Sequence, residues 1–126
     1  MSQSIYYQFL PPPVELPPMR AGEIDGRYID CTPDLGPVED FFTGMGSISL
    51  EITRQDGQGM GAGDLQLATT EWPSTLDTTG LIVTFGFIAP PESANVCYNL
   101  KFTANPTNQG RIFIRDLYIP ILGRMG

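Results

Sequence analysis

The sequence has no histidine in its 126 residues. Histidine is the side chain that most often serves as a general base and as a transition-metal ligand, so zinc, haem and Ser-His-Asp chemistry have no foundation in this chain. A cysteine nucleophile needs a base as well, and the neighbours of Cys97, Val96 and Tyr98, supply none. We therefore predict a protein that is not an enzyme, with no catalytic residues, no cofactor and no metal.

Positive charge and long apolar segments are scarce too. Lys and Arg number 7 against 14 Asp and Glu, and the net charge of −7 disfavours binding to nucleic acid or to anionic lipid. No apolar run approaches the roughly 20 residues that span a bilayer, and no signal-like segment opens the chain. We expect a soluble, unsecreted protein with neither nucleic acid nor a membrane as partner. In that setting Cys31 and Cys97 are expected to be reduced rather than paired.

The charges that are present are unevenly spread. Residues 101–126 carry 4 basic side chains and 1 acidic one, whereas residues 1–100 carry 3 basic and 13 acidic ones. Two alternatives follow. Either the two regions form faces of opposite sign that attract copies of the chain head to tail, or the mixture is solvated and has no such role.

The first 24 residues differ in composition from the rest. Prolines at 11–13 and 17–18 favour an extended backbone, and they follow an apolar cluster that is too large to stay in water. We predict a Pro-rich arm over residues 1–24 and a folded domain over residues 25–126. The cluster is covered either by this domain or by a neighbouring subunit, which the extended spacer brings within reach. The predicted partner-binding residues are Ile5, Tyr6, Tyr7, Phe9, Leu10, Val14, Leu16 and Trp72.

From residue 27 onward the apolar residues recur with the two-residue period of half-buried strands. Strands are expected at 28–32, 47–53, 65–69, 81–88, 95–104 and 111–121, and the segment 37–43 is left open between a helical turn and an irregular crossover. The alternation in 95–104 places Cys97 outward. About seven short strands without a helical period predict an all-β fold, an immunoglobulin-like antiparallel β-sandwich, with a jelly roll as second choice.

Two polar features invite a functional interpretation, and both have a plainer one. The glycine-rich segment 57–63 lacks the Lys-Ser/Thr and the helix of a phosphate-binding loop, so we interpret it as a hairpin tip, and its flanking Asp56 and Asp64 match no EF-hand. Asp30, Asp34, Glu39 and Asp40 form the densest acidic patch, which we interpret as a solvated face rather than a glycosidase pair.

Two single residues leave alternatives open. Trp72 either belongs to the core or is a contact anchor at the edge of the sandwich. Arg111 and Arg115 lie in one predicted strand, and they either point into water or form an interface salt bridge.

Four segments resemble small phage virion proteins of the tail fibre adaptor type, which are described as immunoglobulin-like. They are Arg-Tyr-Ile-Asp-Cys-Thr-Pro at 27–33, the strand at 48–52, Tyr-Asn-Leu-Lys-Phe-Thr-Ala at 98–104, and Gly110-Arg111 with Arg115 and Ile-Pro-Ile at 119–121. The resemblance covers roughly residues 27–121 and departs from the family at the 57–63 loop and the Pro-rich arm. It implies assembly rather than catalysis, with copies arrayed around a tail or connector.

The leading hypothesis is therefore a virion structural protein, assembled in the host cytoplasm. It links a tail or head–tail connector ring to tail fibres or to neighbouring subunits, as a homo-oligomer in a ring. The alternatives are a capsid decoration protein and a carbohydrate- or ligand-binding module that stacks sugars on Trp72, Tyr6, Tyr7 or Tyr118.

Overall fold

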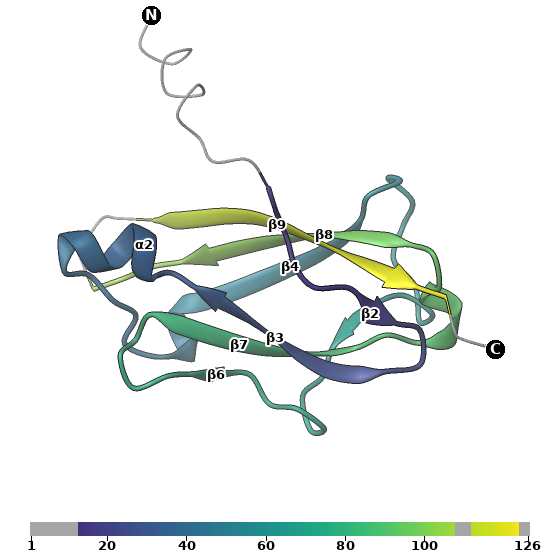
Figure 1. Cartoon of the computed structure of the whole chain (residues 1–126), viewed down its shortest axis with the longest axis horizontal. Coiled ribbons are helices and arrows are strands. Elements are labelled where there is room, and N and C mark those ends of the chain that lie inside the picture. Colours follow the sequence, from purple (N-terminus) through teal and green to yellow (C-terminus); the bar gives the residue numbers. More distant parts are fainter. Residues whose placement is uncertain (1–12, 108–111, 124–126) are drawn as a thin grey trace, which may run out of the picture.

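The computed structural model describes residues 13–107 and 112–123, which form two β-sheets packed face to face (Figure 1). Nine strands occur in these residues, four of them only two residues long. They are β1 Val14–Glu15, β2 Met19–Arg20, β3 Ile24–Asp30, β4 Ile48–Arg54, β5 Gln66–Leu67, β6 Thr75–Leu76, β7 Ile82–Ile88, β8 Cys97–Ala104 and β9 Phe113–Leu122. The helical elements are α2 Thr32–Leu35 and the 3-10 turns η1 Gly36–Val38, η2 Met45–Ser47 and η3 Pro91–Ser93.

One sheet has the order β1-β9-β8-β4, with β2 also on β9, and the other has the order β3-β7-β5, with β6 also on β7. The long strands pair antiparallel, whereas β1 and β2 run parallel to β9. The prediction of an all-β sandwich is therefore confirmed. The neighbour orders β3-β7-β5 and β9-β8-β4 are those of strands B-E-D and G-F-C in immunoglobulin-like sandwiches. This agreement supports the immunoglobulin-like assignment, which stays a prediction.

The core lies between the sheets and follows the predicted alternation. Val83, Phe85 and Phe87 of β7 are buried, and so are Tyr98, Leu100, Phe102 and Ala104 of β8. Phe102 meets Phe42, Phe85 and Phe113 edge to face, with ring centroids 5.9–6.1 Å apart. Such contacts contribute about 0.5–1.5 kcal/mol each beyond the burial of the rings.

The segment predicted as an arm is divided in the structure. Residues 13–24 belong to the sandwich, because β1 and β2 pair with β9 and Leu16, Met19 and Ala21 are buried in the core. Pro17 and Pro18 separate β1 from β2, and the Arg27 guanidinium donates to both proline carbonyls at 2.7 Å. The folded unit therefore begins before residue 25. Residues 1–12 lie outside the described residues.

One predicted strand ends earlier than expected, and the segment that the sequence leaves open has no strand. Thr32 opens α2 instead of ending a strand, because Pro33 suits the first turn of a helix. The open segment 37–43 begins within the 3-10 turn η1 and continues without a strand. Cys31 and Cys97 are both free. They lie at opposite ends of the sandwich, since Cys31 follows the last residue of β3 and Cys97 pairs with Pro120 near the end of β9.

Candidate functional site

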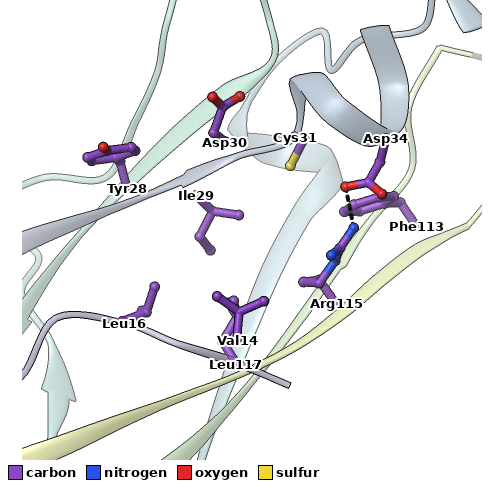
Figure 2. Close-up of a pocket in the computed structure, with 10 residues that line it drawn as sticks. All are labelled: Val14, Leu16, Tyr28, Ile29, Asp30, Cys31, Asp34, Phe113, Arg115 and Leu117. Carbon is purple, nitrogen blue, oxygen red and sulfur yellow. Dashed lines mark hydrogen bonds and ion pairs between the residues drawn. The ribbon is translucent and has the colours of Figure 1, made fainter. Parts of the chain in front are cut away.

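A groove opens at the seam where the edge of one sheet meets the edge of the other (Figure 2). Its volume is about 230 Å³, whereas a water molecule occupies about 30 Å³ in the liquid. It therefore has room for side chains. We call it the seam groove; its lining is Val14, Leu16, Tyr28, Ile29, Asp30, Cys31, Asp34, Phe113, Arg115 and Leu117.

The groove exists because the arm covers only part of the β9 edge. Val14 pairs with Leu117, so β1 starts four residues after β9 does. Leu16 N–H donates to Tyr118 O, and Ala21 N–H donates to Leu122 O, both at 2.9 Å. Backbone groups alternate along a strand, so those of Ile114 and Asp116 face the same edge. The register of Val14 with Leu117 brings β1 to the Asp116 carbonyl, but no strand of residues 13–107 or 112–123 pairs with Ile114 at this edge.

The facing wall is also a sheet edge. β3 pairs with β7 along one side, and no other strand in the described parts of the chain pairs with its opposite side. Tyr28 stands at the rim and remains 67% exposed, while Ile29 and Cys31 are buried behind it. Two unpaired sheet edges therefore border one apolar groove.

Arg115 is the basic residue of the groove lining. It shares the inward face of β9 with Phe113 and Leu117, pairs with the Asp34 carboxylate, and lies with its guanidinium carbon 5.4 Å from the centre of the Phe113 ring (Figure 2). Its Nε is buried and has no acceptor among the described residues. A buried donor without an acceptor costs about 1–3 kcal/mol, so the groove is chemically incomplete.

Cys31 lines the same groove and is almost fully buried. Burial is the main cause that raises the pKa of its thiol to about 12. The thiolate is the reactive form of cysteine, so this residue acts as a small apolar side chain at neutral pH.

A second polar cluster lies at the opposite end of the sandwich and closes the glycine-rich loop. Arg54 donates to Asp56 at 2.8 and 3.0 Å and to Asp64 at 2.8 Å. Asp64 also accepts from the buried Tyr98 hydroxyl at 2.6 Å and from Gly61 N–H at 2.7 Å. The Tyr98 hydrogen bond is the largest cause that lowers the pKa of Asp64. Both carboxylates therefore already accept hydrogen bonds from other groups of the same chain.

Trp72 lies far from the core, on the outer face of the sheet that contains β3 and β7. Its indole crosses Gly26 and Gly86, which are paired in register, and a β-carbon on Gly26 would lie 2.5 Å from Trp72 Cζ2. Trp72 keeps 39% of its surface exposed. The indole therefore packs against Gly26 and Gly86 on the outside of the sandwich. The alternative that Trp72 belongs to the core is wrong.

Of the predicted partner-binding residues, the structure brings Val14 and Leu16 together in the seam groove and leaves Trp72 on another face. Ile5, Tyr6, Tyr7, Phe9 and Leu10 lie outside the described residues, as does Arg111. The sequence interpretation missed the groove role of Arg115. Its position in step with Phe113 and Leu117 was the signal that it faces inward.

The predicted acidic patch is not one solvated face. Asp40 is buried and accepts from the Thr107 hydroxyl at 2.5 Å, Asp34 pairs with Arg115, and Asp30 accepts from Thr32 N–H. Across the described residues, no group of three or more His, Cys, Asp or Glu side chains is placed to hold a metal ion. In the same residues, no helix is long and apolar enough to cross a membrane.

Within residues 13–107 and 112–123, the fold and the groove define a β-sandwich whose groove is bordered by sheet edges without a partner strand. No family model matches the chain, and no curated protein matches its sequence. Among solved structures, an endo-fucoidan hydrolase of glycoside hydrolase family 107 is similar over 91% of this chain, with 9% identity and a TM-score of 0.43. The chain spans 13% of that enzyme's length. A likeness at this level carries no argument about activity.

Proposed function

We propose that this chain is a non-enzymatic structural module that joins protein subunits by accepting an extended segment along the seam groove. The observation that carries the proposal is the pair of unpaired sheet edges, on β3 and β9, that border one apolar groove. An exposed sheet edge binds a further strand through backbone hydrogen bonds, and a flanking groove selects its side chains. Both elements of that recognition mode are present.

The proposal extends to the setting that the sequence resemblance implies. In that setting the chain is a bacteriophage virion protein, an adaptor between a tail or head–tail connector ring and the fibres or neighbouring copies. The segments that carry the resemblance include β8 and the part of β3 that lines the groove. A capsid decoration protein would use the same edge in the same way.

The test is the mass of the purified protein in solution. We expect the full chain to form an oligomer by light scattering, and a variant that lacks residues 1–10 to be monomeric. This variant retains β1 and β2, and with them the core residues Leu16, Met19 and Ala21. Its circular dichroism spectrum and unfolding midpoint should therefore match those of the full chain. A full chain that stays monomeric at all concentrations would contradict self-assembly.

A ligand-binding module is the second candidate, and one observation favours it. Trp72 and Tyr28 lie on the same outer face of β3 and β7, both exposed, and aromatic faces stack on sugar rings. Monomeric full-length protein whose tryptophan emission shifts with added oligosaccharide would favour this candidate over assembly.

A further inference from the structure

We infer that the seam groove is filled by residues 5–10 of a second copy of this chain, which add a strand between β3 and β9. This inference rests on the proposed function and names the donor and the acceptor. Four observations support it, two on the acceptor and two on the donor.

The chain's own arm leads away from the groove. Val14 still lines it, but Pro13 borders a different cavity, together with Glu51, Lys101 and Asp116 on the outer face of the sheet that contains β4, β8 and β9. In Figure 1 the purple start of the described chain rises past β9 on that side. A proline carries no N–H, so Pro11, Pro12 and Pro13 cannot donate to the free β9 carbonyl. Pro13 therefore points out of the groove, and residues 13–107 and 112–123 leave the groove open.

At the edge of β9 that borders the groove, backbone groups have no hydrogen-bond partner strand among the described residues. Ile114 turns its N–H and C=O groups toward the edge where β1 has not yet begun. The buried Arg115 Nε also has no acceptor in the described part of the chain. A strand laid in the groove supplies an N–H donor to the Ile114 carbonyl, and its carbonyls accept from the Ile114 amide and from Arg115.

The donor has the composition of such a strand. Residues 5–10 read Ile-Tyr-Tyr-Gln-Phe-Leu, rich in β-formers and without a charged side chain. Successive side chains of an added strand point to opposite faces, so Ile5, Tyr7 and Phe9 would share one largely apolar face, and Gln8 would lie on the other. We expect the apolar face to enter the groove against Phe113 and Leu117.

The spacer makes the exchange between copies feasible. Three prolines separate Leu10 from Val14, and polyproline II advances about 3.1 Å per residue without folding back. A spacer in that conformation holds the segment that precedes it away from the domain that follows. Each copy can give its segment to one neighbour and accept a segment from another, which is the head-to-tail contact that closes into a ring.

The experiment is a disulfide cross-link between two variants of the full chain, mixed in solution. The donor variant carries Tyr6→Cys, and the acceptor variant carries Tyr28→Cys, which replaces the exposed side chain at the groove rim, together with an affinity tag that changes its mass. Both also carry Cys97→Ser, and Cys31 is left because its thiol is buried. Circular dichroism checks that each variant folds.

We expect mild oxidation to give a mixed dimer of donor and tagged acceptor on a non-reducing gel, at least tenfold stronger than with Tyr7→Cys as donor. Tyr7 is the matched control, because its side chain enters the groove, whereas Tyr6 lies on the outer face with Tyr28. Equal cross-linking from both positions would contradict a strand docked by its apolar face.

Two other outcomes overturn the inference in different ways. A single chain that carries Tyr6→Cys and Tyr28→Cys and closes an internal disulfide at high dilution would show that the segment fills its own groove. An oligomer that loses mass on removal of residues 1–10, yet gives no cross-link, would leave the proposed function standing and place the donor elsewhere. A monomeric full chain would instead remove the proposed function itself.

Discussion

Two inward-facing arginines, near opposite ends of the sandwich, have different surroundings. Arg54 donates to Asp56 and Asp64, and Asp64 is further held by Tyr98 and Gly61, so the buried polar groups of this cluster are matched within one chain. Arg115 has Asp34 and the Phe113 ring, but its buried Nε has no acceptor among the described residues. The first cluster secures a loop. The second marks a surface that requires something further.

The largest expected effect is the loss of stability when the hydrogen bonds of Asp64 to Arg54 and Tyr98 are removed. Asp64→Ala leaves the buried Tyr98 hydroxyl without its acceptor, so the free energy of unfolding should fall by about 2–3 kcal/mol. Asp34→Ala should cost less than about 1 kcal/mol, because the Asp34 carboxylate is partly solvated. Urea unfolding of both variants measures the difference. Equal losses of stability in the two variants would contradict the difference between the surroundings of Arg54 and Arg115.

A second, smaller effect concerns the two thiols. Cys31 is buried in the groove wall with its pKa raised to about 12, whereas Cys97 is only half-buried. Iodoacetamide should therefore label Cys31, in a Cys97→Ser variant, at least tenfold more slowly than it labels Cys97 in a Cys31→Ser variant. Mass spectrometry over time gives both rates. Rapid labelling of Cys31 in the folded protein would mean that the seam opens readily.

The smallest effect is the pH dependence of the stability that Asp56 and Asp64 contribute. The Arg54 hydrogen bond lowers the pKa of Asp56 to about 2, and the Tyr98 hydroxyl is the main cause that lowers the pKa of Asp64. A carboxyl group whose pKa is lower in the folded state stabilises that state above its unfolded pKa of about 3.9, and this contribution is lost as the pH falls.

The difference in stability between the wild type and Asp64→Asn should thus persist at pH 6 and shrink between about pH 4 and pH 2. Urea midpoints across that range provide the measurement. A difference that stays constant down to pH 2 would show that the carboxylate charge plays no part.

The long strands were predictable because their burial follows a local rule. The alternation in β8 separates the buried Tyr98, Leu100 and Phe102 from Asn99 and Lys101, and a period of two residues can be read from the sequence. The short pairings of the arm were not predictable in this way. Prolines around β1 and β2 suggest a free arm, and only the unpaired edge of β9 gives Val14 and Met19 a partner.

The candidate site also has some features that the sequence predicts and others that it does not. The apolar segment at 5–10 is evident from composition alone, and so is the absence of histidine. The placement of Trp72 was not, since it depends on Gly26 and Gly86, which are 60 residues apart in the sequence and adjacent across two strands. Nor was the pairing of Arg115 with Asp34, which joins residues separated by 81 positions.

By itself, the sequence determined the sandwich, its buried strand faces and its composition without histidine, because side-chain alternation and residue type are local properties. Tertiary structure alone decided that residues 13–24 join a sheet, that β3 and β9 each have an edge with no partner strand among the described residues, and that Arg115 lies between these edges. The physical reason is that an edge, a groove and an unmatched buried donor are defined by what the rest of the fold leaves uncovered. No local pattern of residues contains that information.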